Sequence, residues 1–221
     1  MLKLSGHKAL SLTPGKISAI LVANTGEYFR LIQALKGETE ELWLFDDFDQ
    51  CEVKRNLAWD GDVVLNQQWQ EKYIGALLKK LNQDLLAEER TKLTTLVDHL
   101  YMVAQEELYQ YDLPLVANYN GNLLQLYKSM KIHVAPSKLT KPYDIIATDI
   151  RFHIELNDHE VVGLCNVANY LTATEISDLK ALIHDANLAV LLVEFSDKRI
   201  RPMFGDADVM YIDEDFIDWF L

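Results

Sequence analysis

Residues 161–195 read VVGLCNVANYLTATEISDLKALIHDANLAVLLVEF, and this stretch decides the fold. The run 161–167 is apolar, rich in valine and too short for a helix, which predicts a buried strand. Thr172 and Glu175 have the spacing of a capping box, so a helix is predicted over 173–186. A second apolar run, 188–195, predicts another buried strand. The stretch therefore predicts two parallel strands joined by a helix in a right-handed connection.

The first third and the end of the chain carry signals of the same kind. Short strands are predicted at 9–12 and 17–23, joined as a hairpin by the turn Thr13-Pro14-Gly15. A helix is predicted over 27–35 and strands at 42–45 and 209–212, with a final helical turn over 214–220. Strand signals at both ends of the chain predict that the two ends contribute to one sheet.

The middle of the chain has a different pattern. From about residue 67 to 156, apolar residues recur every three or four positions, which predicts amphipathic helices, the last over 143–156. We therefore predict an α/β head domain with a central, partly parallel sheet from residues 1–66 and 157–221. Residues 67–156 are predicted to form an inserted, extended helical leg domain.

Composition narrows the class of protein. The 221 residues include 34 acids and 21 bases, a net charge of −13, which keeps a protein soluble without excluding local contacts to nucleic acid. Two cysteines cannot build a disulfide framework. No apolar run approaches the roughly 18 residues of a membrane span. These features predict a cytoplasmic protein with no membrane partner.

The sequence has no legible catalytic centre. The turn 13–18 resembles half of a phosphate-binding loop, but Leu10 and Ile17 stand where that motif requires glycine and a hydroxyl residue. The six histidines form no zinc or metalloprotease motif, and no serine stands in a nucleophile elbow. We therefore expect no enzymatic activity and no bound nucleotide.

Basic residues gather in one part of this acidic chain. Between positions 128 and 151 there are two acids and five bases, namely Lys128, Lys131, Lys138, Lys141 and Arg151. Lys54 and Arg55 form a further basic pair. Such local excesses of positive charge are where a phosphate backbone would bind. The competing interpretation is that these bases only keep the surface soluble.

The strand 41–46, ELWLFD, and Asn166 with the turn 170–172, YLT, resemble segments of the Csn-two family, the small CRISPR-associated adaptation proteins of type II-A systems. The first is similar to a family strand, and the second is similar to another strand and its capped helix. The segment 187–194 resembles the next strand with its terminal Glu194. The segments 126–130, LYKSM, and 132–134, IHV, resemble a family helix and the strand after it. The set spans most of the chain in the family's order.

The resemblance implies a fold and a function. The head would be distantly like a nucleotide hydrolase, with a degenerate phosphate loop, and the middle of the chain would form the leg. Members are non-catalytic homotetrameric rings in prokaryotic cytoplasm that bind the ends of double-stranded DNA through lysines. They act in spacer acquisition, an antiviral defence, beside other CRISPR adaptation proteins and the RNA-guided nuclease. They bind calcium through acids of the helical region.

The candidate site residues follow from both arguments. Lys128 matches the family's lysine by motif, whereas Lys54, Arg55, Lys131 and Lys138 are predicted DNA contacts on electrostatic grounds. The stretch matching the family's acidic calcium region, 107–122, keeps only Glu107 and Asp112 as acids. These two are the candidate calcium ligands, and a ring without metal is the alternative.

Two other functions stay open at this point. A degenerate phosphate-loop protein would still bind a nucleotide, which calorimetric titration with ATP and magnesium would detect. A protein-interaction scaffold would use its acidic surface to bind a basic partner and would fail to bind duplex DNA at low salt.

Overall fold

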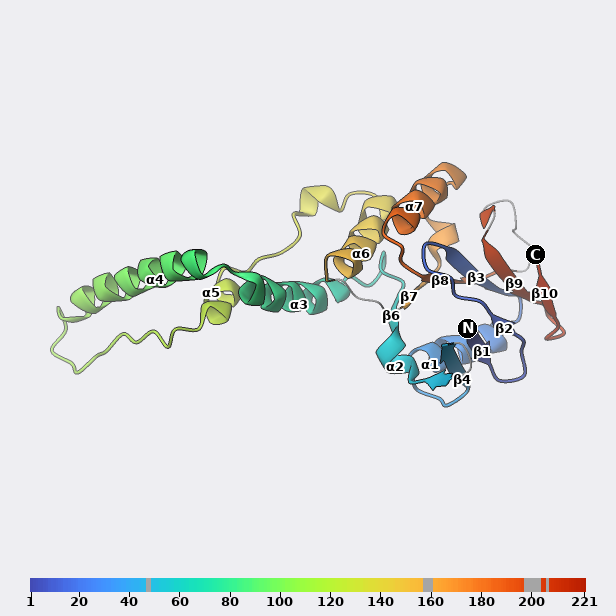
Figure 1. Ribbon diagram of the computed structural model, residues 1–221, viewed down its shortest axis with the longest axis horizontal. Helices are drawn as coiled ribbons and strands as arrows, with labels where there is room; N and C mark the ends of the chain where they lie inside the picture. The colour runs from blue at the N-terminus through green and yellow to red at the C-terminus, as the bar shows by residue number, and fades with distance from the viewer. Residues whose placement is uncertain (47–48, 157–160, 197–203, 206) are drawn as a thin grey trace. The chain divides into compact units, whose positions relative to one another are not determined.

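The computed structural model describes residues 1–46, 49–156, 161–196, 204–205 and 207–221 (Figure 1). The chain divides into two compact units, the first formed by residues 1–69 and 135–221 and the second by residues 70–134. The second unit is thus inserted into the first. The predicted boundaries of the helical domain, 67–156, are wrong at their C-terminal side. Helix α6 (Pro142–Leu156) belongs to the first unit because its inward face, including Ile146 and Ile150, is fully buried there.

A six-stranded sheet forms the centre of the first unit, in the order β10-β9-β3-β8-β7-β6. All neighbours in it are parallel except β10, which pairs with β9 in antiparallel fashion. The predicted α/β class with a partly parallel sheet is therefore confirmed. The strands are β3 (Ile17–Val22), β6 (Leu57–Gly61), β7 (Val161–Cys165), β8 (Val190–Phe195), β9 (Asp208–Ile212) and β10 (Asp218–Phe220).

The strand–helix–strand unit predicted over 161–195 is confirmed as β7, α7 (Ala173–Asp185) and β8. Strands β7 and β8 are parallel neighbours. The Thr172 side chain accepts from the Glu175 amide at 3.3 Å, and the Glu175 carboxylate accepts from the Thr172 amide at 2.9 Å. Asn166 and Asn187 adopt left-handed backbone conformations, with φ of 62° and 53°. Asparagine tolerates this region better than most residues, which gives a physical reason for asparagine in the two connections that flank α7.

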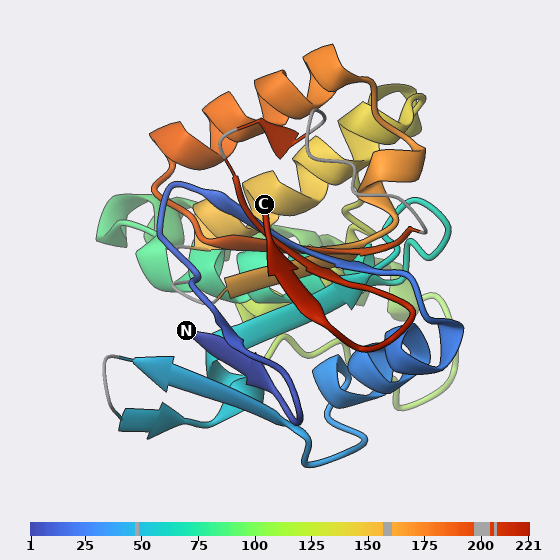
Figure 2. The same cartoon turned by 90° about the vertical axis from the view of Figure 1, so that its right-hand side faces the viewer.

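Helices and a small second sheet cover the two faces of the large sheet. Figure 2 shows α6 and α7 on one face and α1 (Thr25–Leu35) with the small sheet on the other. The small sheet is antiparallel throughout, in the order β2-β1-β4-β5. One apolar core joins Leu2 and Leu44 of the small sheet to Leu31 of α1 and to Val22 of β3. The small-sheet strands are β1 (Leu2–Leu4), β2 (Ala9–Leu10), β4 (Leu42–Asp46) and β5 (Asp49–Cys51), and the short helix α2 (Val53–Asn56) follows.

Several local predictions were wrong. The turn at 13–15 exists, since the Lys16 amide donates to the Thr13 carbonyl at 3.1 Å, but it does not close a hairpin. Strand β2 pairs with β1, whereas β3 lies between β8 and β9, where all six of its residues are buried. Residues 214–220 form the strand β10 with its turn rather than a helical turn. His133 lies outside any strand, because residues 132–135 have no regular structure.

The second unit is helical. It contains nearly all of α3 (Trp69–Asp84), together with α4 (Ala87–Leu108) and α5 (Leu123–Ser129). A small apolar cluster of Leu78, Leu123 and Tyr127 joins α3 to α5. Helix α4 keeps a row of exposed apolar side chains that includes Leu96, Leu100 and Val103. The 3-10 helices η1 (Pro136–Lys138) and η2 (Val167–Asn169) belong to the first unit. No helix among the described residues is long and apolar enough to cross a membrane.

Candidate functional site

The C-terminal ends of the parallel strands are the natural place for a site in this fold. In open α/β sheets, ligands bind at this edge, where loops from neighbouring strands meet. Here β6, β7 and β8 end beside one another. Their ends and the adjoining helices bring together a group of side chains that we call the strand-end cluster. It consists of Tyr28, Asp62, Cys165, Asn166, Tyr170 and Glu194.

Asp62 is the centre of the strand-end cluster. Its Oδ2 accepts from the Asn166 Nδ2 at 3.0 Å and from the Tyr170 hydroxyl at 2.8 Å. The Tyr28 hydroxyl in turn donates to the Asn166 Oδ1 at 3.3 Å. The left-handed backbone of Asn166 places its side chain between these partners directly after β7. The hydrogen bonds therefore tie β6, β7 and α1 together at one edge.

Glu194 is the most perturbed carboxyl of the cluster. Its side chain is buried near the end of β8, with 2% of its surface exposed. Burial raises the pKa of Glu194 to about 7, while hydrogen bonds from the backbone of Ala168 and Val167 oppose the rise. The Ala168 amide lies 3.0 Å from Oε1. Between about pH 4.5 and pH 7 this site therefore keeps a proton that an exposed glutamate would have lost.

The thiol of Cys165 and the hydroxyls of Tyr28 and Tyr170 are held in their neutral forms. Burial raises the pKa of the Cys165 thiol and that of the Tyr170 hydroxyl to about 12 each. It also raises the pKa of Tyr28. A thiol needs a lowered pKa to act as a nucleophile near neutral pH. The raised pKa of Cys165 is thus the opposite of what a nucleophilic thiol needs. The hydrogen bonds of the cluster hold together the segments that follow β6 and β7.

The connection from β3 to α1 stands where nucleotide-binding sheets carry their phosphate loop. Only Ala23 and Asn24 join the two elements. The Asn24 side chain already accepts from the amides of Gly26 and Glu27, at 2.9 Å and 3.1 Å. The buried Glu27 carboxylate lies in this first turn, where it binds Arg30 at 2.6 Å and His7 at 2.9 Å. A phosphate would have to compete with a cap and a carboxylate for this helix end, in contrast to known phosphate sites.

Replacing Asp62 with alanine should lower the free energy of unfolding by about 2 kcal/mol, because two hydrogen bonds to a charged acceptor are removed. Urea denaturation at pH 7 measures this change. Asp62→Asn is the matched control, since it keeps the size and one acceptor oxygen, and it should cost less. Equal stability of Asp62→Ala and the natural protein would show that Asp62 does not hold the cluster together.

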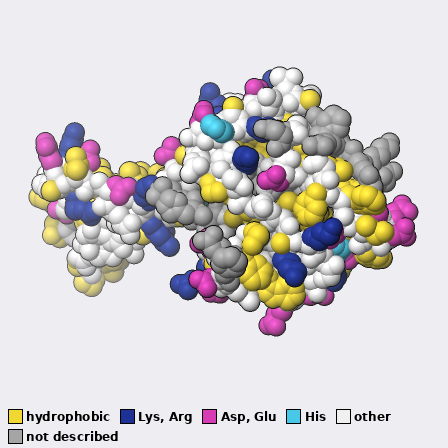
Figure 3. Space-filling model, turned by 45° about the vertical axis from the view of Figure 1, so that its right-hand side comes forward, with side chains coloured by type: hydrophobic (Ala, Val, Ile, Leu, Met, Phe, Trp, Pro, Cys, Tyr) yellow, Lys and Arg dark blue, Asp and Glu magenta, His cyan; other side chains and the backbone are white. Residues whose placement is uncertain are grey.

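The predicted DNA contacts are exposed, and they belong to two different units. Lys54 and Arg55 lie on α2, and Lys138 lies on η1, all in the first unit. Lys128, in the last turn of α5, and Lys131 lie in the second unit. In the view of Figure 3, Lys and Arg side chains stand singly among acidic and apolar ones.

The candidate calcium ligands lie in the second unit. Glu107 and Asp112 are both exposed, and the Glu107 carboxylate accepts from the Gln110 side chain. Calcium takes six to eight oxygen ligands. Among the described residues, a group of three or more potential metal ligands occurs elsewhere, where Asp60, Asp149 and His153 place one ligand atom each within 4.8 Å of one another. Within that group His153 Nε2 lies 2.8 Å from Asp60 Oδ2.

Sequence reasoning missed Asp62 and the Asp60–Asp149–His153 group. Asp60 lies in β6 and Asp62 directly follows it, and this strand was not recognised, so neither acid was placed at a strand end. Asp149 and His153 are four residues apart within the predicted helix, a spacing that puts them on one face. That spacing was the available signal for the pair.

Comparison with known proteins supports the fold. No family model matches the chain, and no curated protein matches its sequence. Stu0660 of Streptococcus thermophilus has a solved structure that matches with a TM-score of 0.61 and 14% identity, over 100% of this chain and 75% of Stu0660. The ADP conformation of MJ1267, an ATP-binding cassette of an ABC transporter, matches with a TM-score of 0.47 and 10% identity, over 94% of this chain and 84% of that one. The chain therefore shares its fold with Stu0660.

Proposed function

We propose that this chain belongs to the Csn-two family and binds the ends of double-stranded DNA without catalysis and without reading base sequence. It acts as a homotetrameric ring in CRISPR spacer acquisition, beside the other adaptation proteins and the RNA-guided nuclease. Two findings support the family: the resembling segments lie in the expected order along the chain, and the fold of Stu0660 covers all of it. This likeness concerns the fold, so the DNA-binding role rests on the basic residues.

The observation that carries the proposal is the state of the bases between positions 128 and 151. All five are exposed, and none of them forms an ion pair with a described residue. Arg30, by contrast, is bound by Glu27 and Glu41. Exposed, unpaired bases are free to meet phosphates, and contacts to phosphates position a protein on DNA without specifying sequence.

The exposed apolar side chains of α4 support self-association. Leu96, Leu100 and Val103 are 59%, 60% and 44% exposed, and helical spacing places them on one face. A continuous exposed apolar face of this kind marks an interaction surface. A ring of identical chains would remove it from water. Calcium bound by Glu107 and Asp112 would stabilise such an assembly. Two carboxylates, however, supply only a small part of the six to eight oxygen ligands that calcium takes.

In solution the mass should be about four times the 25.4 kDa of one chain, both with calcium and after chelation. Sedimentation equilibrium or light scattering measures it. Leu96→Glu together with Leu100→Glu should shift the protein to smaller species, because charge would face the partner chain. Thr91→Glu, on another face of α4, is the matched control. A stable monomer under both calcium conditions would contradict the ring.

A further inference from the structure

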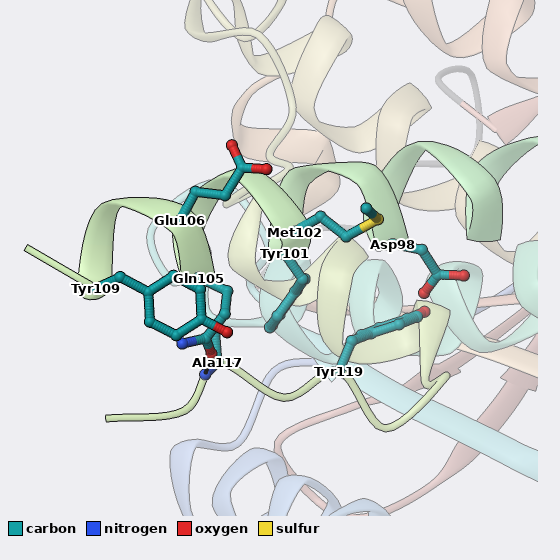
Figure 4. Close-up of a pocket in the computed structure, with 8 residues that line it drawn as sticks. All are labelled: Asp98, Tyr101, Met102, Gln105, Glu106, Tyr109, Ala117 and Tyr119. Atoms are coloured by element: carbon teal, nitrogen blue, oxygen red, sulfur yellow. Dashed lines mark hydrogen bonds between the residues drawn. The ribbon is translucent and has the colours of Figure 1, made fainter. Parts of the chain in front are cut away.

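The second unit contains a hollow of about 440 Å³ whose lining is aromatic and acidic. It lies between α4 and the segment that leads to α5 (Figure 4). Tyr101, Tyr109 and Tyr119 contribute aromatic rings, and Asp98 and Glu106 contribute carboxylates. Among the described residues that line it there is no Lys, Arg or His. We call it the tyrosine pocket.

Specific contacts hold the walls of the tyrosine pocket in place. The Gln105 side chain donates to the Leu115 carbonyl at 3.1 Å and accepts from the Ala117 amide at 2.7 Å. The side-chain amide of Gln105 thus makes the same two kinds of hydrogen bond with residues 115–117 that a neighbouring strand would make, and it fixes this segment to α4. The rings of Tyr101 and Tyr119 meet with centroids 5.4 Å apart. The pocket is therefore largely formed before any ligand arrives.

One polar group of the pocket is left unsatisfied. The Tyr119 hydroxyl oxygen is buried and has no hydrogen-bond partner among the described residues. Figure 4 shows it beside the Asp98 carboxylate. Burial and the nearby charge of Asp98 both raise the pKa of Tyr119, which keeps the hydroxyl neutral. Buried polar atoms are rarely left without a partner in proteins, so an unsatisfied one calls for an explanation. A ligand with several N–H groups could donate hydrogen bonds to the Tyr119 hydroxyl oxygen and to the Asp98 carboxylate at once.

We propose that the tyrosine pocket binds the guanidinium group of an arginine side chain presented by a partner protein. A guanidinium is planar and weakly hydrated, so it stacks on tyrosine rings, and its fork of donors fits a carboxylate. The charge of the pocket favours it, since Asp98 and Glu106 are not opposed by a base in the lining. The same two carboxylates repel phosphates, which distinguishes this pocket from the proposed DNA contacts.

A neighbouring hollow gives room for the rest of a bound peptide. It measures about 260 Å³ and shares Tyr101 and Tyr119 with the tyrosine pocket. Its other lining residues include Asn118, Asn120 and Gln125, whose amide groups both donate and accept hydrogen bonds. A peptide backbone has the same mixture of donors and acceptors. The two hollows together therefore fit an arginine with its flanking residues better than a small free cation.

Titration of the full-length protein with a short peptide tests this inference. The probe is acetyl-Gly-Arg-Gly-amide, and the readout is the NMR shifts of labelled tyrosines. We expect Tyr101, Tyr109 and Tyr119 to shift together. The lysine peptide should bind about fivefold more weakly, because ammonium stacks less well. The citrulline peptide, which has the same shape without the charge, should not bind measurably.

Pocket variants separate this site from general attraction to an acidic protein. Asp98→Asn should weaken arginine binding by about tenfold and Tyr119→Phe by about threefold, the scale of one charge contact and one hydrogen bond. Asp84→Asn, at an exposed position at the end of α3, makes the same change in charge outside the pocket and should have no effect. Equal binding of the citrulline peptide, or equal weakening by Asp98→Asn and Asp84→Asn, would overturn the inference. If the tyrosine shifts change when the protein alone is diluted, the pocket is occupied by a second copy of this chain. That result would overturn the inference that a partner protein supplies the arginine.

Discussion

Replacing Lys128, Lys131 and Lys138 with glutamine together should weaken binding of a short linear duplex by about a hundredfold at low salt. Each lysine is expected to neutralise one phosphate and to release the counterions held there. The slope of log K against log salt should therefore fall by about 0.9 for each phosphate that is no longer neutralised. Fluorescence anisotropy over a series of salt concentrations measures both quantities.

The matched control is a variant with the same change in charge outside the predicted contacts. Lys3, Lys79 and Lys92 are exposed, and none of them belongs to the predicted set. Their replacement with glutamine should change affinity much less, because distant charges are screened by salt. Equal weakening by the two triple variants would mean that net charge, rather than these three lysines, governs binding.

Replacing Glu194 with glutamine should stabilise the protein above pH 7 by up to about 3 kcal/mol. The pKa of Glu194 is raised to about 7 from an ordinary value of 4.5, and each unit corresponds to about 1.4 kcal/mol. Between these values the folded protein keeps a proton that the unfolded chain releases. The stability contributed by protonated Glu194 is thus fully present below pH 4.5 and is lost as the pH rises to 7. Glutamine stays neutral and still accepts from the Ala168 amide.

Urea denaturation at pH 5, 6, 7 and 8 measures this effect as the difference between the variant and the natural protein. That difference should grow with pH and level off near pH 8. Glu40→Gln is the control, because it removes an exposed carboxylate instead of a buried one. Its difference in free energy of unfolding from the natural protein should not change with pH. A flat difference for Glu194→Gln as well would show that burial does not raise the pKa of this carboxyl.

The part of the fold that could be predicted is the part with local signals. In 161–195 the apolar runs, the Thr172–Glu175 box and the asparagine at each helix-flanking turn all act within a few residues. The prediction of a hairpin at 13–15 was wrong because the deciding contacts are distant in sequence. Its turn was predicted correctly, but the choice of partner for β3 is decided by burial between β8 and β9, which come from the far end of the chain. Strands of two to five residues such as β2 and β6 leave too little pattern to be found alone.

The candidate site was less predictable than the fold. Glu194 was singled out at the end of its strand, but its shifted pKa comes from burial by residues distant in sequence. Asp62 gains its role from Asn166 and Tyr170, more than a hundred residues away. The predicted domains already divided the predicted DNA contacts between head and leg, and of these residues the structure moves only Lys138, from the leg to the first unit. The tyrosine pocket likewise depends on Gln105 binding the backbone of 115–117, a contact with no sequence signature.

The measurement that tests the central claim most directly compares one duplex in two forms. One form is a covalently closed, relaxed circular duplex, and the other is the same duplex made linear by a single double-strand cut. The two have the same sequence and essentially the same charge, and only the linear form has ends. Competition binding at low salt should show strong binding of the cut form and at least about tenfold weaker binding of the circle, because a closed ring must be threaded from an end. Equal affinity for the two forms would contradict DNA-end binding by a ring.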